Sequence, residues 1–221
     1  MEDIETFHVI SEECVTVPES IETFHVIIKM VSNTGGITMD RSRAMEELSL
    51  RLENQNLIKH SLAVESIMRK MAEVFNEDTE LWGIAGLVHD IDLERIQNKM
   101  ELHGMMGGDI LEQLGFDPTI VYAVRAHNPL NNYPRRRKID KALYCADPIS
   151  GLITACALIL PDKKLENIDN DFVLKRFYEK GFAWGVRRNQ IVSCSELGLS
   201  LETFIKLSLE AMKEISQQLG L

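Results

Sequence analysis

The sequence predicts an all-α protein with one main domain. Apolar residues recur at spacings of three and four from residue 40 onward, and capping residues precede several of these runs. A possible alternating pattern occurs only in TFHVIIKMV at 23–31, which would be a short strand. With 221 residues, 45% of them apolar, the chain can bury one sizeable core.

The first 38 residues differ from the rest of the chain. The heptapeptide IETFHVI occurs at 4–10 and again at 21–27, and SNTGG at 32–36 then breaks the pattern. Two copies are too few for a solenoid, so we interpret them as a local duplication. We expect residues 1–38 to form a peripheral N-terminal extension and residues 39–221 to form the domain. We do not expect His8 or His25 in the repeats to bind metal.

The first helical patterns lie between Met39 and residue 90. One of them carries a stripe at spacings of three and four: His60, Val64, Ile67, Met68, Met71 and Phe75. We expect its apolar members to pack in the core. A short apolar helix follows over residues 79–89, and at its end the sequence AGLVHD places His89 and Asp90 side by side.

Caps and prolines indicate the bounds of the later helices. We expect a helix over about 102–114, and Asp117-Pro118 supplies an N-cap and a first-turn proline for another through about 127. Residues 137–159 predict a long apolar helix that Pro148 disturbs. Ser200 caps the last helix, whose apolar stripe is Leu201, Phe204, Ile205, Met212, Ile215 and Leu219.

Composition excludes several classes of function. The net charge of -10 argues against binding to nucleic acid polymers or anionic membranes, although a local basic pocket could hold a phosphate. The chain has no apolar run of about 18 residues and no signal-peptide pattern in its first twenty residues, so we expect a cytoplasmic protein. Its four cysteines are far apart and indicate neither a zinc cluster nor a disulfide framework.

Six polar residues interrupt the apolar helical patterns or lie at their edges. They are His60, His89, Asp90, His103, His127 and Asp147. Buried imidazoles and carboxylates are costly unless they are paired, hydrogen-bonded or metal-bound. Four imidazoles and two carboxylates, without a thiolate, suit transition metals such as Fe, Mn, Co, Ni or Zn.

The order of these residues resembles the H…HD…D motif of the HD-domain superfamily of metal-dependent phosphohydrolases. The matching segments are IKHSLAVES, GLVHDID and LYCADPIS, and the resemblance covers roughly residues 55–160. ELHGMMGGDILEQLG at 101–115 and VYAVRAHN at 121–128 resemble the segments that carry two further histidines in members that hold two metals.

The resemblance implies a helical bundle around a buried site for one or two divalent ions, with Fe or Mn favoured over Ni, Co and Zn. His60, His89, Asp90 and Asp147 would hold the first ion, and Asp90 would bridge to a second ion held by His103 and His127. His89 and Asp90 would be catalytic. A metal-bound hydroxide would attack a phosphate ester or anhydride of a nucleotide or small phosphorylated metabolite. Whether the protein forms a homo-oligomer is an open question at this point.

The tract after the HD pair departs from the family pattern. Many members continue HDIGK, whereas this chain has HDIDLE. Asp92 would repel phosphate if it faced the metals, or it could hold a ligand histidine in place, or be solvated. Arg135, Arg187 and Arg188 are candidates for binding a substrate phosphate, and a purely solvated role is the alternative.

Two other functions stay open at this point. The domain could be a non-catalytic module that senses nucleotides, or it could be a di-iron oxygenase, because some proteins of this superfamily cleave C–C or C–P bonds.

Overall fold

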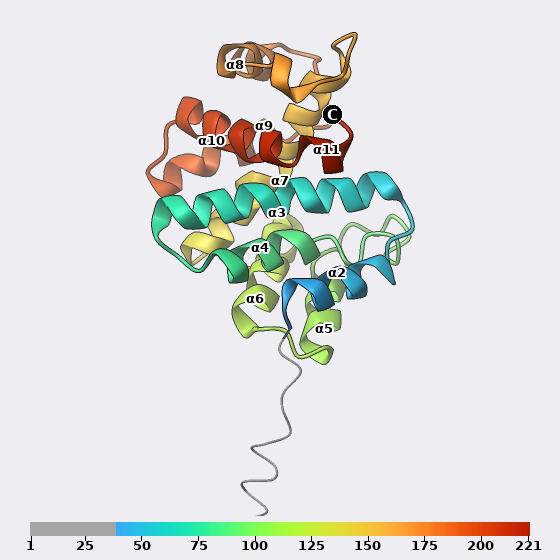
Figure 1. The fold of residues 1–221 in the computed structure, drawn as a ribbon. Coiled ribbons are helices and arrows are strands. Elements are labelled where there is room, and N and C mark those ends of the chain that lie inside the picture. Colours follow the sequence, from blue (N-terminus) through green and yellow to red (C-terminus); the bar gives the residue numbers. More distant parts are fainter. Residues whose placement is uncertain (1–38) are drawn as a thin grey trace, which may run out of the picture. The chain divides into compact units, whose positions relative to one another are not determined.

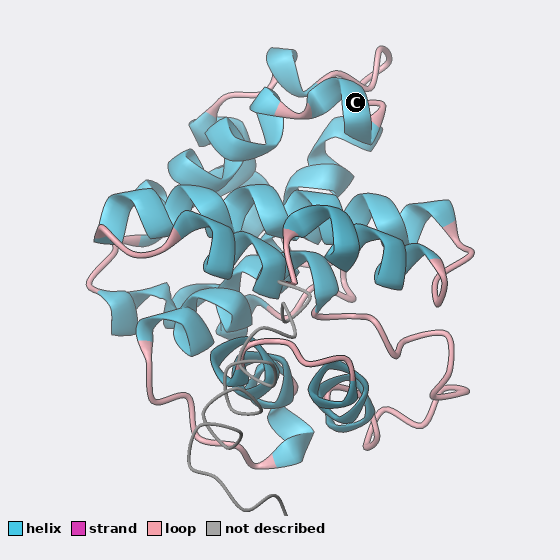
Figure 2. Cartoon of the chain, turned by 60° about the horizontal axis from the view of Figure 1, so that its bottom comes forward, coloured by secondary structure: helices cyan, strands magenta, loops and turns pink. Residues whose placement is uncertain are grey.

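The computed structural model describes residues 39–221, and all regular structure in this range is helical (Figure 1). No strand occurs within the described range, and Figure 2 shows only helices joined by loops there. The all-α prediction is confirmed. The repeated heptapeptide and the possible strand at 23–31 lie outside the described residues. None of the helices in residues 39–221 is long and apolar enough to cross a membrane.

Two long helices organise the bundle, α3 (Gln55–Phe75) and α7 (Lys138–Leu158). The other α-helices are α2 (Arg41–Ser49), α4 (Thr79–Val88), α5 (Met105–Gln113), α6 (Pro118–His127), α8 (Asn170–Tyr178), α9 (Arg188–Val192), α10 (Leu201–Glu214) and α11 (Ser216–Leu219). Three short 3-10 helices complete the described elements: η1 (Pro129–Asn131), η2 (Leu165–Asn167) and η3 (Ser193–Leu197).

Helix α3 lies across the middle of the bundle and packs against α4, α7 and α10 (Figure 1). Val64, Ile67, Met68 and Met71 are completely buried, which confirms the apolar part of the predicted stripe. The backbones of α3 and α4 are in close approach, because a Cβ added at Gly86 would lie 2.9 Å from backbone atoms of Glu65. This packing brings the end of α4 against the helix that carries His60.

Local capping determines where several helices begin and end. The Asp78 carboxylate accepts hydrogen bonds from two first-turn amides of α4, and Asp117 caps α6 with Pro118 in the first turn, as predicted. Helix α4 ends at Val88, so His89 is its C-cap and Asp90 lies in the following turn. His89 keeps helical dihedrals, with φ of -59° and ψ of -32°, and the Ile91 amide donates to the Val88 carbonyl at 3.2 Å.

Three helix predictions need correction. The helix expected from about 102 begins at Met105, because Gly104 has a φ of 78° and cannot continue a right-handed helix, so His103 lies in a turn. Helix α7 continues through Pro148 without a break, although this proline supplies no amide to the carbonyl four residues earlier. The last predicted helix is divided at Ile215, whose φ of -112° and ψ of 15° separate α10 from α11.

Candidate metal centre

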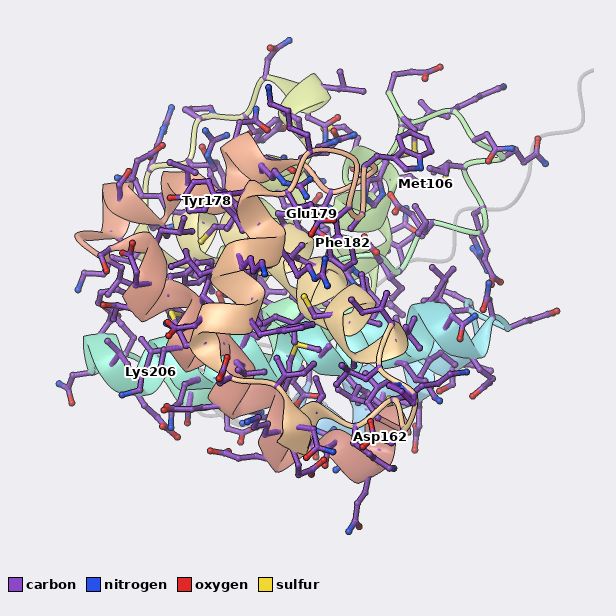
Figure 3. The ribbon with its side chains drawn as sticks, turned by 90° about the horizontal axis from the view of Figure 1, so that it is seen from above. Met106, Asp162, Tyr178, Glu179, Phe182 and Lys206 are labelled. Carbon is purple, nitrogen blue, oxygen red and sulfur yellow. The ribbon has the colours of Figure 1, made fainter. Side chains whose placement is uncertain are left out.

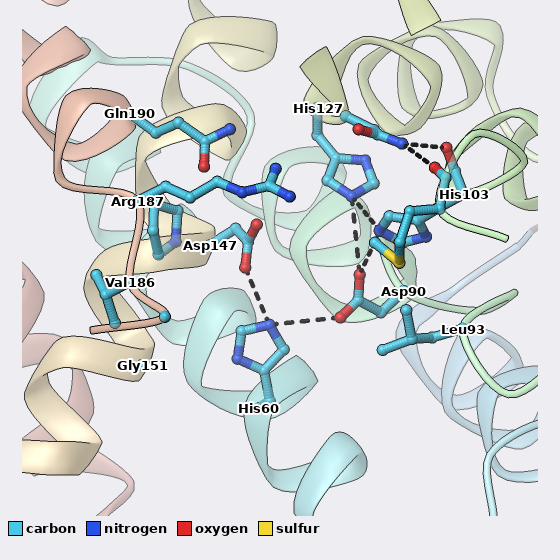
Figure 4. A pocket seen from close by; sticks show the side chains of 14 residues that line it. His60, Asp90, Leu93, His103, His127, Asp147, Gly151, Val186, Arg187 and Gln190 are labelled. Carbon is cyan, nitrogen blue, oxygen red and sulfur yellow. Dashed lines mark hydrogen bonds and ion pairs between the residues drawn. The ribbon is translucent and has the colours of Figure 1, made fainter. Parts of the chain in front are cut away.

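All six ligand-type residues predicted from the sequence meet at one place, and Figure 4 shows five of them, all except His89. His60 comes from α3, His127 from the end of α6 and Asp147 from α7. The other three, His89, Asp90 and His103, lie in turns next to α4 and α5. Five of the six line a cavity of about 280 Å³, and His89 is completely buried beside it.

Helix ends orient two of the imidazoles. His89 Nδ1 donates to the Gly86 carbonyl at 2.7 Å, and His127 Nδ1 donates to the Val124 carbonyl at 2.6 Å. In both cases the acceptor lies three residues earlier at the end of a helix, where carbonyls have no intrahelical partner. Each Nε2 is therefore left as an acceptor that faces the other site residues.

Side chains orient the other two imidazoles in the same sense. His103 Nδ1 lies 2.8 Å from Asp92 Oδ1, to which it donates. The Ser150 hydroxyl donates to the Asp147 carbonyl at 2.8 Å, so its oxygen accepts from His60 Nδ1 at 3.0 Å. All four histidines thus use Nδ1 for support and direct Nε2 toward the centre.

The distances between these nitrogens fit a site for cations. His60 Nε2 is 3.2 Å from His89 Nε2, and His103 Nε2 is 3.0 Å from His127 Nε2. Two lone pairs at such distances repel each other unless a proton or a metal ion lies with them. Imidazole nitrogens together with carboxylate oxygens are the donors that first-row transition metals prefer. The residues therefore fit a divalent metal centre.

The donors form two groups that share one carboxylate. His60, His89 and Asp90 make one group, and Asp90, His103 and His127 make the other, with the ligand atoms of each group within 4.8 Å of one another. Asp90 Oδ1 lies 3.2 Å from Nε2 of both His89 and His103. Asp147 Oδ1 joins the first group at 3.2 Å from His60 Nε2.

Asp92 supports a histidine from within the protein. Its carboxylate is completely buried and accepts from the amides of Gly104 at 2.8 Å and Gly107 at 2.7 Å, in addition to His103 Nδ1. The solvated alternative for Asp92 is wrong, and its charge is satisfied away from the cavity. This carboxylate fixes the orientation of the His103 ring and makes its Nε2 more basic.

The close packing of charges shifts the proton affinities of the site. Burial lowers the pKa of His89 to about 4. Burial also acts to lower the pKa of His103, but hydrogen bonds to Asp90 and Asp92 outweigh it and raise the pKa to about 10. Burial acts to raise the pKa of Asp90, but the surrounding imidazoles hold it well below its ordinary value. At neutral pH the metal-free site thus retains a proton on His103 that a divalent ion would displace.

The three arginines considered from the sequence lie in different places. Arg187 lines the cavity, and its guanidinium extends into it on the side of Asp147 (Figure 4). Arg188 points elsewhere and donates to backbone carbonyls, including those of Phe177 and Phe182. Arg135 stacks on the Tyr144 ring, 3.7 Å from its centroid, and does not line the cavity.

Sequence reasoning missed three polar residues of the site. Ser150 holds His60, the Asn128 amide group donates to the His103 carbonyl at 2.9 Å, and the buried Gln190 lines the cavity. Ser150 follows Asp147 by three positions on one helix, and Gln190 follows Arg187 by three. This spacing, which places residues on one helix face, was the available signal.

Comparison with known families agrees with the geometry. Residues 57–152 match the model of the HD domain, and all six ligand-type residues lie inside this range. These residues form an HD domain. The HD superfamily is one of metal-dependent phosphohydrolases, so the chain carries the domain of a hydrolase superfamily.

The chain is similar to larger curated proteins named ribonuclease Y. The chain is 29% identical to that of Nitratidesulfovibrio vulgaris (strain DP4) over 61% of this chain and 26% of the relative. It is 30% identical to that of Desulfotalea psychrophila over 52% of this chain and 22% of the relative. For Sulfurovum sp. the identity is 26% over 74% of this chain and 32% of the relative. The chain thus spans about a third or less of these relatives, and no solved structure is significantly similar to it.

Proposed function

We propose that the protein is a phosphohydrolase with two divalent metal ions, acting on a phosphate ester or anhydride of a nucleotide or small phosphorylated metabolite. The observation that carries the proposal is the convergence of four Nε2 atoms on two carboxylates beside an open cavity. Four separate supports at Nδ1 produce this convergence, and ordinary core packing does not require it.

The donor groups define the roles of the ligands in this proposal. His60, His89 and Asp147 would hold one ion, His103 and His127 would hold the other, and Asp90 would contact both. Such ions lower the pKa of bound water and neutralise phosphate oxygens. We favour Fe or Mn over Ni, Co and Zn, since imidazoles with carboxylates and no thiolate form a borderline to hard donor set.

Residues of the chain would position the substrate phosphate. Asp147 is the most exposed of the six, with 32% of its side chain accessible, so the substrate would approach from its side. Arg187 lies on that side and would pair with phosphate oxygens, for which a planar guanidinium is well suited. The buried wall of His89 and His127 would exclude bulk water from the opposite side.

A second candidate substrate is an RNA phosphodiester, because the relatives are named as ribonucleases. The same site would serve, since both reactions transfer a phosphoryl group to water. The net charge of -10 disfavours long polymers, which bind through many phosphate contacts. A mononucleotide or the end of a short RNA satisfies both observations.

The test is hydrolysis by protein stripped of metal, reloaded anaerobically with Mn(II) or Fe(II), and assayed both without and with oxygen. The panel comprises nucleoside mono- and diphosphates, dinucleotides, sugar phosphates and short RNAs. We expect turnover that requires metal and is lost in His127→Gln but kept in Arg136→Ala, an exposed arginine outside the cavity. Tight nucleotide binding without turnover would instead support a sensor, and turnover that requires oxygen would support an oxygenase. Either result would overturn the proposal.

A further inference from the structure

A large exposed aromatic residue comes directly before three residues that line the cavity. Gly185, Val186 and Arg187 line the cavity, and Trp184 directly precedes them. Trp184 is 89% exposed, whereas the other tryptophan of the chain, Trp82, is 3% exposed. Exposure of so large an apolar surface is unfavourable in a free protein, and stacking on a ligand would remove the ring from water.

The segment 179–187 has an unusual backbone that holds Trp184 outward. Gly181 has a φ of 93°, and Ala183, which carries a Cβ, has a φ of 43°. Positive φ is unfavourable for alanine, so the fold must compensate for it. The Ala183 carbonyl accepts from the Val186 amide at 2.9 Å, which closes a tight turn with Trp184 at its tip.

Arg188 supplies the compensation. Its guanidinium donates to the carbonyls of Phe177 and Phe182 at 2.7 and 2.5 Å, and to three others at up to 3.5 Å. Figure 3 shows Glu179 and Phe182 next to each other at the start of the segment, and the Phe182 amide donates to the Glu179 carbonyl at 3.3 Å. One arginine thus ties both ends of the turn and holds the backbone that carries Trp184.

Arg187, the residue before Arg188, points away from the carbonyls that Arg188 binds. Arg187 extends into the cavity toward the side of Asp147, and no carboxylate among the described residues pairs with it (Figure 4). A guanidinium in the cavity and an exposed aromatic ring three positions earlier in the chain are the two kinds of group that bind a phosphate and a nucleobase. A sugar phosphate has no base and would therefore contact only the cation, Arg187.

We propose that Trp184 stacks on the nucleobase of the substrate while Arg187 holds its phosphate, so that the segment 179–187 selects nucleotides over phosphorylated compounds without a base. The inference deepens the proposed function and rests on it for the position of the reacting phosphate. The base can belong to a mononucleotide or to the end of an RNA, because every base has a face that stacks.

The test is fluorescence of Trp184 in the full chain, metal-free and loaded with Mg(II). Adenosine 5′-monophosphate and a short oligoribonucleotide are compared with ribose 5-phosphate and inorganic phosphate. We expect saturable quenching by the two probes that carry bases and none by the other two. Trp184→Phe, which leaves only the buried Trp82 as a tryptophan, should abolish the signal change. Stronger quenching by the oligoribonucleotide would identify RNA as the source of the base, and equal or stronger quenching by the mononucleotide would identify a free nucleotide.

Activity provides a second measurement. Trp184→Ala should raise KM for the nucleotide about tenfold, the scale of one lost stacking interaction, and leave KM for ribose 5-phosphate unchanged. Tyr178→Ala is the control, since Tyr178 is 67% exposed but, unlike Trp184, is not next in the chain to a residue that lines the cavity. Quenching without turnover of any substrate would defeat the proposed function and leave this inference intact. Turnover without quenching, with Trp184→Ala unchanged toward nucleotides, would overturn the inference alone.

Discussion

The two halves of the candidate metal centre differ in exposure and in how they are supported. In the inner half, the side chains of His103 and His127 are 8% and 2% exposed, and the buried carboxylate of Asp92 holds His103. In the outer half, His60 and Asp147 are 23% and 32% exposed although His89 is completely buried, and the neutral hydroxyl of Ser150 holds His60. Hydrogen bonds to a charged group are roughly twice as strong as neutral ones.

This difference suggests a division of tasks. The inner half is fixed before any ligand arrives, because Asp92 also binds two backbone amides and cannot turn without losing them. The outer half adjoins the open side of the cavity and can meet a substrate. Asp90 connects the two halves, so changes at Asp90, Asp92 and Ser150 should affect them to different extents.

The largest effect is expected for Asp90→Asn, which removes the charge shared by both halves. We expect both ions to bind weakly and kcat/KM to fall about 10³-fold or more, the scale of a lost group that stabilises charge in the transition state. Metal content and steady-state kinetics measure this. Normal occupancy of both halves in Asp90→Asn would show that Asp90 does not connect them.

Asp92→Asn should affect the inner half selectively. The amide NH2 of asparagine donates and cannot accept, so one of the two accepting positions of the carboxylate is lost. We therefore expect metal affinity at His103 and His127 to fall about 10–100-fold while the outer ion is retained. Asp109→Asn is the matched control, because Asp109 is 61% exposed and, among residues 39–221, pairs only with Arg125. An equal loss at both halves, measured by calorimetry, would contradict the division.

The stability of the metal-free protein should depend on pH through the same half. The pKa of His103 is raised to about 10 from an ordinary value of about 6.5, so folding favours its protonated form. This contribution to the free energy of unfolding is complete below about pH 6.5 and is lost as the pH rises through about 10, with a slope of at most about 1.4 kcal/mol per pH unit. Urea unfolding between pH 6.5 and 10 measures it. His103→Gln should flatten the dependence, and an unchanged slope would assign the effect to another group.

The smallest effect is expected for Ser150→Ala in the outer half. His60 loses a neutral acceptor at Nδ1 but keeps its contact with Asp147, so we expect metal affinity there to fall about tenfold, at the low end of such effects. Ser66→Ala is the control, because Ser66 also donates to a carbonyl three residues earlier on a helix. If Ser150→Ala weakens the site more than Asp92→Asn, the order of support is reversed.

The sequence predicted what local patterns determine. The helices follow from apolar spacing and caps, and the six ligand-type residues were found because each is a polar residue within an apolar pattern. The role of Asp92 was left among three alternatives, since it depends on amides of Gly104 and Gly107 that lie twelve and fifteen residues further along the chain. No local sequence pattern predicts a contact between residues so far apart in the chain.

Arg187 and Arg188 show the same limit of prediction from sequence. Arg187 and Arg188 are neighbours of identical chemistry, and the sequence gives no reason to separate them. The structure directs one into the cavity and the other onto five carbonyls, because helix α9 begins at Arg188 and the preceding turn places the two side chains apart. The exposure of Trp184 likewise depends on this turn and not on its own sequence neighbours.

The central claim is that the site holds two ions in two distinct halves. Elemental analysis combined with anomalous scattering from crystals of the metal-loaded protein tests it most directly. The account predicts two anomalous peaks, one among His60, His89 and Asp147 and one beside His103 and His127, both next to Asp90. It also predicts that His103→Ala and His127→Ala lose the second peak and keep the fold. A single fully occupied ion that neither substitution affects would contradict it.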